Sequence, residues 1–435
     1  MNDILASVDG DLVAPGRPEL GRLVHWSGGG GLPIHRWFRY REGFSPGLID
    51  ELALGRRILD PFCGSGSIMV GAAGQGRSSV GIDVNPLAAF VARVKLSPLA
   101  AADVSEVTAF LRRYDEELPH AEPWPAPGLR IAGKVFEPDV LDELLRLRTV
   151  IEERAATKEQ RHFLLLAWLA ILQDVGSYFK EGNGIKYRNR QRRTGGYVAR
   201  PDGPWQLERF GADQRAFVRA TYRGQLAAML DDVAAWQHGN WGAQRIIEGN
   251  SLDVLGQLER RSFDSVLFSP PYANRFDYFE SQKVELWFGG FVDSYDELTA
   301  LRKRSLRSHL GAALDRPVDD RPELEALIGM IDPDCYAARQ RVPALVRGYF
   351  SDMADVLRHC RRVLVPGGRC CVVVGNSAYG GVIIPTDSLV ARLGLEAGFG
   401  RASVVPVRHL TVAPQQRRAL QGREAWMRES IVILA

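Results

Sequence analysis

A glycine-rich turn between an apolar strand and a helix does most to restrict the fold of this chain. The segment Arg57-Ile58-Leu59 has the composition of a short strand that ends at Asp60, and Ile68 to Gly74 has that of a helix. Between them, Gly64 and Gly66 let the backbone turn sharply and approach a ligand closely. The helix that follows would present free N–H groups at its start. No Gly-Lys-Ser/Thr follows the turn, so the pattern predicts a nucleotide-binding α/β sheet without a P-loop.

A second strand ends in an acidic residue, about 20 residues after the glycines. Ser79 to Ile82 is the strand, Asp83 ends it, and Asn85-Pro86 begins another helix. In nucleotide-binding α/β folds an acidic residue at this position holds the ribose hydroxyls. The alternative is that Asp83 only caps the helix and binds no ligand.

A third strand, Asp264 to Phe268, is stopped by the turn Ser269-Pro270-Pro271-Tyr272. Two prolines fix the backbone, and a rigid turn at the carboxyl end of a strand is where open α/β sheets bind ligands. The Ser269 hydroxyl and the Pro270 carbonyl offer two acceptors, and Tyr272 offers a flat ring. These groups suit a planar ring with an exocyclic amine. Taken alone, the four residues are equally typical of an ordinary proline-rich turn.

The strand and helix alternation divides the chain into parts. We expect a polar, flexible arm over residues 1–32, the first part of a sheet over 33–96 and a helical segment over 97–243. The second part of the sheet then covers 244–435, with another mainly helical segment at about 274–345. Phe44-Ser45-Pro46 is expected to start a helix, with Ser45 as its N-cap and Pro46 as its first residue.

One stretch of the 97–243 segment is strongly basic. It interleaves Gly, Asn and Tyr with cations, so it is expected to be a mobile loop that follows a phosphate backbone. The alternative is a solvated loop with no partner. Its local charge is +5, six positive groups less Glu181; the cations are Lys180, Lys186, Arg188, Arg190, Arg192 and Arg193.

The composition of the whole chain excludes several other classes of protein. The net charge is only +3 over 435 residues, so local charge carries more information than the total. Five cysteines without a Cys-x-x-Cys pair argue against a disulfide framework and against a zinc site, and no metal is expected. The first residues lack a basic segment followed by an apolar one, and no apolar run approaches about 18 residues. We therefore expect a cytoplasmic protein.

Together these motifs resemble the DNA methyltransferases that methylate amines with S-adenosylmethionine. The resemblance rests on Asp60-Pro61-Phe62-Cys63-Gly64-Ser65-Gly66, on Asp83 and on Ser269-Pro270-Pro271-Tyr272. Ser at position 269 resembles the N4-cytosine subgroup, because N6-adenine enzymes more often carry Asp there. The resemblance covers about residues 33–96, 244–280 and 349–435. It implies a Rossmann-like class I methyltransferase fold, an α/β sheet of seven mostly parallel strands with helices on both faces and two mainly helical insertions.

The resemblance also implies roles for individual residues. Gly64 and Gly66 would line the methionine side of the cofactor, Asp60 would reach its amino group and Asp83 its ribose. Asn250 to Asp253 would flank the adenine. The full set of expected cofactor residues is Phe44, Ser45, Pro46, Asp60, Phe62, Cys63, Gly64, Ser65, Gly66, Asp83, Val84, Asn250, Ser251 and Asp253.

The expected substrate is a cytosine flipped out of duplex DNA, because an amine inside a duplex cannot reach a bound methyl donor. Tyr272 would stack on the base, while Ser269 and the Pro270 carbonyl accept the amine N–H bonds. Cys63 is not expected to be a nucleophile, since Pro271 is followed by Tyr272 and not by Cys. The region 97–243 is the favoured site of target recognition, and the resemblance allows a companion restriction endonuclease.

Alternatives come from several classes of protein. An N6-adenine DNA methyltransferase differs mainly at position 269. An RNA guanine N2-methyltransferase also uses a Pro-Pro-Tyr-like turn, but usually brings an N-terminal RNA-binding domain. A small-molecule methyltransferase has no need of the basic stretch, and a catalytically silent DNA-binding relative has no need of intact Gly64, Gly66, Asp83 and Ser269.

Overall fold

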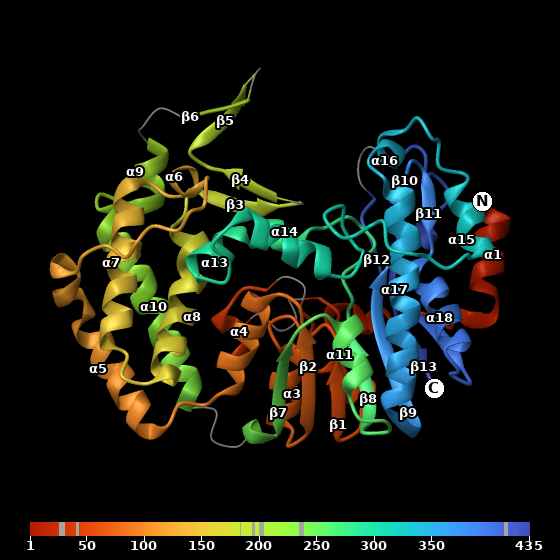
Figure 1. The fold of residues 1–435 in the computed structure, drawn as a ribbon, viewed down its shortest axis with the longest axis horizontal. Coiled ribbons are helices and arrows are strands. Elements are labelled where there is room, and N and C mark those ends of the chain that lie inside the picture. The colour runs from red at the N-terminus through yellow and green to blue at the C-terminus, as the bar shows by residue number, and fades with distance from the viewer. Residues whose placement is uncertain are drawn as a thin grey trace.

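The computed structural model describes residues 1–25, 31–40, 43–182, 184–193, 196–199, 204–234, 239–412 and 416–435. Seven strands of this part form one sheet in the order β12-β13-β9-β8-β1-β2-β7 (Figure 1). Neighbouring strands are parallel except where β13 meets β9 and β12. The predicted α/β sheet of seven mostly parallel strands is confirmed. Its strands are β1 (Arg57–Asp60), β2 (Ser78–Asp83), β7 (Gln244–Glu248), β8 (Phe263–Phe268), β9 (Leu364–Gly375), β12 (Ala402–His409) and β13 (Arg428–Leu434).

Side chains alternate between the two faces of this sheet, as the period of a strand requires. Ile58 and Leu267 point into an apolar cluster that includes helices α2 (Leu48–Glu51) and α3 (Ser67–Gly74). Their neighbours Leu59, Val266 and Phe268 point into a larger cluster on the other face. That cluster is formed with α11 (Ser251–Gln257), α17 (Val342–Val363) and α18 (Thr386–Glu396). Both faces of the sheet are therefore covered, which explains why consecutive residues of the central strands are apolar, as in Ile58–Leu59 and Val266–Phe268.

The order in which the chain adds strands to the sheet reverses between β1 and β8. From β1 the chain continues to β2 and β7 on one side, then returns to β8 and β9 on the other. In open α/β sheets the crevice at such a switch point, outside the carboxyl ends of the strands, is the usual ligand site. The Gly64–Gly66 turn follows β1 and the Ser269–Tyr272 turn follows β8. The topology therefore brings together two motifs that are about 200 residues apart in the sequence.

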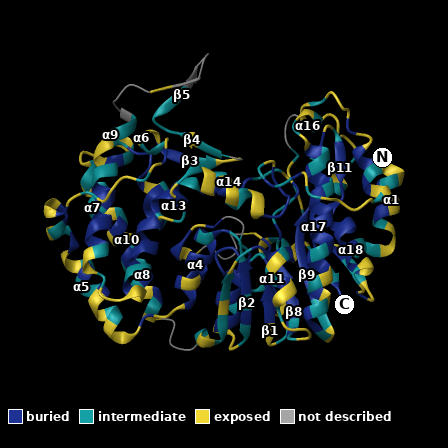
Figure 2. Cartoon of the chain, viewed as in Figure 1, coloured by how far each residue is buried: buried dark blue, intermediate teal, exposed yellow. Residues whose placement is uncertain are grey.

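A group of helices lies beside the sheet next to α4 (Pro86–Leu96), at the left in Figure 1. They share one apolar core with α4, which Figure 2 shows as a dark interior under an exposed rim. Asp232 fixes the neighbouring chain to this group by accepting hydrogen bonds from Ile34 N–H and the Trp37 indole. The helices are α5 (Ala101–Glu117), α6 (Ala132–Val135), α7 (Pro138–Arg154), α8 (Lys158–Val175), α9 (Pro204–Phe210) and α10 (Gln214–Ala234).

The segment between β8 and α17 consists of short helices joined by loops. The first two carry buried aromatic side chains, and α14 crosses above the carboxyl ends of the strands (Figure 1). These helices are α12 (Tyr278–Ser281), α13 (Lys283–Phe288), α14 (Tyr295–Arg304), α15 (Pro322–Ile328) and α16 (Tyr336–Arg339). No helix in the described residues is both long and apolar enough to cross a membrane.

The prediction of a flexible N-terminal arm is wrong for the described residues 1–25. Asn2–Asp9 forms helix α1, in which Leu5 and Val8 are fully buried. Asp9 also forms a salt bridge with Arg428 at 2.9 Å and accepts a hydrogen bond from Ser388. One pair of apolar residues three apart is enough to dock such a short helix, because α15 and α18, which contact it, supply the remaining surface. The glycines at 28–30 lie outside the described residues.

The prediction of a basic mobile loop at 180–193 is also wrong. The described residues form two antiparallel hairpins, β3 (Tyr178–Glu181) with β4 (Gly184–Tyr187), and β5 (Arg190–Arg193) with β6 (Gly196–Ala199). β3 begins with two aromatic residues, Tyr178 and Phe179, and in β4 Ile185 and Tyr187 flank Lys186, which favours a strand pair over a loop. The predicted helix start at Ser45 is displaced as well, because α2 begins at Leu48 and Ser45 accepts a hydrogen bond from Gly47 N–H.

Candidate active site

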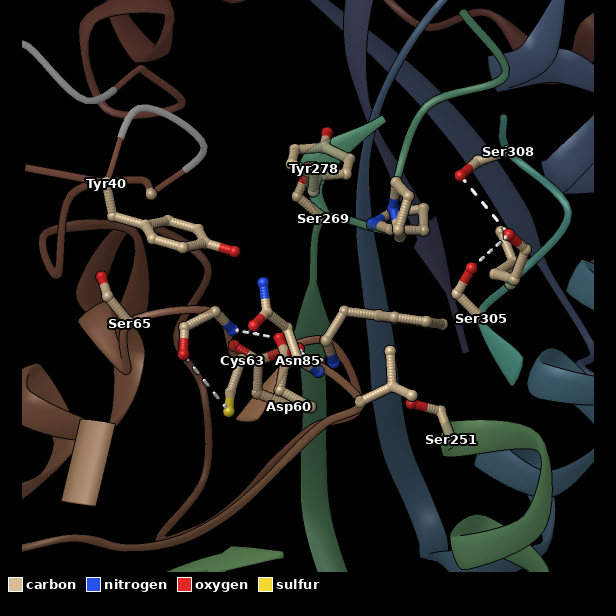
Figure 3. Close-up of a pocket in the computed structure, with 18 of the residues that line it drawn as sticks. Tyr40, Asp60, Cys63, Ser65, Asn85, Ser251, Ser269, Tyr278, Ser305 and Ser308 are labelled. Carbon is tan, nitrogen blue, oxygen red and sulfur yellow. Dashed lines mark hydrogen bonds between the residues drawn. The ribbon is translucent and has the colours of Figure 1, made fainter. Parts of the chain in front are cut away.

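A cavity lies at the switch point, where β1, β2, β7 and β8 end. It encloses about 910 Å³ of space, a volume that includes its open mouth. Figure 3 shows Asp60, Cys63 and Asn85 on its floor, with Ser269 and Tyr278 above them. Ser65 and Tyr40 lie at one side, and Ser305 and Ser308 at the other. The cavity therefore has one side made by the sheet and another made by the segment after β8.

Two carboxylates share the sheet side of the cavity. Asp60 ends β1, is 3% exposed and accepts a hydrogen bond from Phe62 N–H at 3.0 Å. Burial raises the pKa of Asp60 to about 8, and the nearby Asp83 charge adds to that shift. Burial also raises the pKa of Asp83 to about 6, although two backbone hydrogen bonds oppose the shift. A buried carboxyl with a raised pKa lacks a cation beside it. A cationic ligand would supply that charge and stabilise the ionised carboxylate.

Asp83 holds the glycine-rich turn in place. One of its oxygens accepts from Gly64 N–H and the other from Asn85 N–H, both at 2.8 Å. Each oxygen keeps a second lone pair for a ligand hydroxyl. Asn85 and not Asp83 is the N-cap of α4, because the Asn85 side chain accepts from Leu87 N–H. Asp83 instead joins the glycine-rich turn to the chain after β2 and lines the cavity.

The turn itself is shaped by glycine. Gly64 has φ +51°, and a Cβ there would lie 2.8 Å from the Tyr40 ring, so a side chain would push the ring out of place. Gly66 has φ +79° and precedes α3. The Ser65 hydroxyl lines the cavity and is buried without a hydrogen-bond partner among the described atoms. A buried donor left without a partner is costly, and a bound ligand would satisfy it.

Cys63 is buried at the edge of the cavity, and burial raises the pKa of its thiol well above the usual range. The thiol therefore stays protonated near neutral pH, which makes it a poor nucleophile.

The Ser269–Tyr272 turn carries a directed chain of hydrogen bonds. The Ser269 hydroxyl lies 3.5 Å from the Tyr272 hydroxyl, which in turn donates to Glu429 at 2.8 Å. Arg408 donates to the second oxygen of Glu429. Burial and the Glu429 charge raise the pKa of Tyr272 well above its usual range, so the phenol remains a donor. With its proton directed to Tyr272, the Ser269 oxygen presents lone pairs elsewhere, and Ser269 lines the cavity.

A buried polar network forms the far wall. His309 Nδ1 accepts from Gly311 N–H at 3.1 Å, and its Nε2 lies 2.9 Å from the Ser305 hydroxyl. Asp277 lies 3.4 Å from His309 and is bound by Arg302. Burial lowers the pKa of His309, so the ring is neutral near pH 7. A neutral ring that accepts at Nδ1 carries its proton on Nε2 and donates it to Ser305.

Most of the cofactor residues expected from the sequence line this one cavity. These are Phe44, Asp60, Phe62, Cys63, Gly64, Ser65, Asp83, Val84, Asn250 and Ser251, together with Ser269, Pro270 and Pro271 of the turn. Five expected residues do not line it: Ser45, Pro46, Gly66, Asp253 and Tyr272. Asp253 is exposed on α11, while a Cβ at Gly375 would lie 3.0 Å from the Tyr272 ring, so that ring is against the end of β9.

The sequence reasoning missed much of the wall. Tyr278 and Phe279 line the cavity, whereas Trp287 and Phe288 of the same segment are buried in the core. No local pattern in the sequence separates the two pairs. The missed residues include Tyr40, Asn85, Tyr278, Phe279, Ser305, Leu306, Ser308 and His309.

The basic residues lie above this edge of the sheet, on the two hairpins at the upper left of Figure 1. Lys180 forms a largely buried salt bridge with Glu285 at 2.8 Å. Arg188 lies over the Phe179 ring at 5.1 Å, and Lys186 is exposed. Arg190 is partly buried in β5, where Arg192 and Arg193 also lie, but the side chains of these last two are outside the described part.

No protein family model matches this chain. The chain is similar over most of its length to Type II methyltransferases. It is 25% identical to the Type II methyltransferase M.BsoBI of Geobacillus stearothermophilus, over 95% of this chain and 87% of that protein. It is 24% identical to M.AvaI of Nostoc sp., over 87% and 81% of the two chains. It is 22% identical to M.MvaI of Kocuria varians, over 78% and 74%. Similarity and fold together support a methyltransferase.

Proposed function

We propose that this protein is a site-specific DNA methyltransferase that moves a methyl group from S-adenosylmethionine to the N4 amine of a flipped cytosine. The observation that carries the proposal is the single cavity that joins the Asp60–Gly66 turn to Ser269 and Pro270. A site for a nucleoside cofactor and a site for an amine must meet for transfer to occur. Similarity to Type II methyltransferases along most of the chain supports DNA as the substrate.

The residues of the sheet side fit the cofactor. Asp60, with its raised pKa, would pair with the cationic amino group, and Asp83 would use its remaining lone pairs for the ribose hydroxyls. The unpartnered Ser65 hydroxyl would donate to the cofactor carboxylate. Phe44 and Phe62 supply apolar surface, and Asn250 and Ser251 stand where the adenine would end. The cofactor supplies an activated methyl group on a sulfonium.

The turn after β8 prepares the amine. The Ser269 oxygen and the Pro270 carbonyl would accept its two N–H bonds, which turns the nitrogen lone pair toward the methyl group. Because Glu429 directs the protons of Tyr272 and Ser269 along one chain, Ser269 is held as an acceptor before substrate arrives. Tyr278, which lines the cavity, would border the base, and Tyr272 would act through its hydroxyl, which orients Ser269. No strong base is needed before transfer.

Cytosine is proposed over adenine because Ser269 at the start of the turn resembles the N4-cytosine subgroup. A hydroxyl held by Tyr272 accepts one N–H bond without bringing a third carboxylate close to Asp60 and Asp83. Target recognition is proposed for the 97–243 region, where the two hairpins carry the basic residues. We also propose that the protein has a companion restriction endonuclease.

The experiment is methyl transfer from labelled S-adenosylmethionine to duplex DNA, structured RNA and free cytidine, each offered separately. Label in duplex DNA alone is the expected result. Label in RNA or in the free nucleoside would contradict the proposal, and so would cofactor binding without transfer to any acceptor.

A further inference from the structure

Arg275 lies on the loop that follows the Ser269–Tyr272 turn and contacts the far wall of the cavity through its backbone. It is the fourth residue after Pro271, and its backbone is in the left-handed region, with φ +67°. Its N–H donates to the carbonyl of Ser308 at 3.1 Å, and Ser308 lines the cavity. The loop that follows the turn is thereby tied to the far wall. A non-glycine residue held in this conformation next to a site is uncommon and costs free energy, so the surrounding contacts must fix it.

The Arg275 side chain is held by aromatic rings and, in the part of the chain that the structure describes, by no acidic group. Its guanidinium carbon lies 5.7 Å from the centre of the Tyr336 ring and 6.0 Å from that of Tyr379. Among the described residues, no carboxylate is within ion-pair distance of it, and its Nε is buried without an acceptor. Tyr379 is buried and donates to the carbonyl of Ala273, within the same loop. The charge is therefore positioned firmly but not neutralised.

Tyr336 covers the outer side of this charge. The residue is 69% exposed, more than any other large hydrophobic residue in the described chain. It begins the short helix α16, which rises above the sheet on the side opposite the two hairpins (Figure 1). An exposed ring against an unneutralised guanidinium is a surface suited to an anion that carries flat groups.

The proposed reaction defines that anion. A base that enters the cavity leaves its own phosphodiester at the rim, and contacts to phosphates fix the position of a nucleic acid on a protein. Resting on the proposed function, we infer that Arg275 binds the phosphodiester flanking the extruded nucleotide, with Tyr336 packed on the adjoining sugar or base. Arg275 is then a positioning residue, because it holds the strand from which the base is rotated and does not touch the reacting amine.

The test measures duplex binding against salt for wild-type protein and for Arg275→Ala, Arg275→Lys and Tyr336→Ala. Arg275→Ala leaves one phosphate without its cation. This variant should therefore reduce the slope of log affinity against log salt by about 0.9. Arg275→Lys should keep the slope, since it keeps the charge. Arg358→Ala is the matched control, because Arg358 is an exposed arginine near the end of α17 that leads into β9, at the opposite end of the sheet.

A second readout reports the position of the base. With 2-aminopurine at the target position, extrusion from the stack raises fluorescence. We expect Arg275→Ala to lose most of this rise while cofactor affinity is unchanged. Wild-type slope and wild-type fluorescence in a folded Arg275→Ala protein would overturn the inference. Tight, Arg275-dependent binding of inorganic phosphate or deoxycytidine monophosphate would overturn it too, by indicating a site for free phosphate. If the wild-type protein methylates no DNA, the proposed function itself fails.

Discussion

At the scale of single residues, the proposed chemistry depends most on the Ser269 oxygen. Ser269→Ala removes one acceptor for the amine, a loss of about 1.5–3 kcal/mol in the transition state, or roughly tenfold to a hundredfold in turnover. Cofactor affinity measured by calorimetry should be unchanged, because the sheet side of the cavity is intact. Ser105→Ala, an exposed serine on α5, is the control. Near-normal turnover in Ser269→Ala would remove Ser269 from the mechanism.

Asp60 predicts a proton release that can be counted. With a pKa of about 8, Asp60 carries a proton in most molecules at pH 7, and a cationic amino group beside it lowers that pKa. Cofactor binding at pH 7 should therefore release close to one proton, measured by calorimetry in buffers of different ionisation enthalpy. Asp60→Asn should release about one proton fewer. Equal proton counts for the two proteins would contradict the pairing.

The same pKa fixes the sign of a stability effect. Because the folded pKa of Asp60 lies above its ordinary value near 4, folding favours the protonated form. The stability that this group contributes is complete at low pH and is lost as the pH rises toward 8. Without cofactor, the thermal midpoint of the wild-type protein should fall between pH 5 and pH 8 more than that of Asp60→Asn. Parallel pH profiles would show that Asp60 ionises freely.

For single residues, the sequence predicts the positions of the site residues that end a strand or directly follow one. Asp60, Asp83 and Ser269 end or follow apolar strands, and their local pattern is enough to place them at one edge of the sheet. His309 and Ser308 have no such signal. They reach the cavity because the Asp277–Arg302 salt bridge and the Asn85–Gln282 hydrogen bond fold a distant segment over it.

At the scale of elements, helix α1 offers a direct test of its packing. Leu5→Ala removes a fully buried side chain and should lower the free energy of unfolding by roughly 2–5 kcal/mol. Ser7→Ala, on the exposed face of the same helix, should change it by less than about 0.5 kcal/mol. Denaturant unfolding measures both. Equal midpoints for Leu5→Ala and wild type would show that the segment is a flexible arm after all.

The two hairpins carry the second element-scale prediction. Replacing Arg188, Arg190, Arg192 and Arg193 by Ala should weaken duplex binding and flatten its salt dependence, by about 0.9 in slope for each phosphate that is no longer neutralised. Arg112→Ala with Arg113→Ala, on exposed positions of α5, is the control. Affinity that is unchanged across a salt titration would assign the hairpins a role other than DNA binding.

Sequence patterns place long elements better than short ones. The strands of the sheet and helices such as α8 and α10 follow from apolar periodicity. Helix α1 and the pair β3–β4 do not, because each is stabilised by what it docks against. Leu5 and Val8 need the neighbouring α15 and α18, and Lys180 needs Glu285. The cations with interleaved Gly, Asn and Tyr suggested a loop at 180–193, whereas Ile185 and Tyr187, at alternate positions of β4, favour a strand.

At the scale of the whole molecule, the sheet order brings distant parts of the chain to one edge. The reversal between β1 and β8 opens the crevice, and the segments with the hairpins and with α16 rise on its two sides (Figure 1). Alternation of strands and helices predicts such a sheet, since parallel strands need crossover helices. The positions of the flanking segments are not encoded in any local pattern, because packing over the whole chain decides them.

The most direct test of the central claim is the identity of the methylated nucleoside. The protein is incubated with S-adenosylmethionine and unmethylated duplex DNA, which is then digested to nucleosides and analysed by mass spectrometry. The account predicts N4-methylcytosine, formed at a much lower rate when Ser269→Ala replaces the wild-type protein. N6-methyladenine would keep the fold and the cavity but contradict the role given to Ser269, and unmodified DNA would contradict the proposed function.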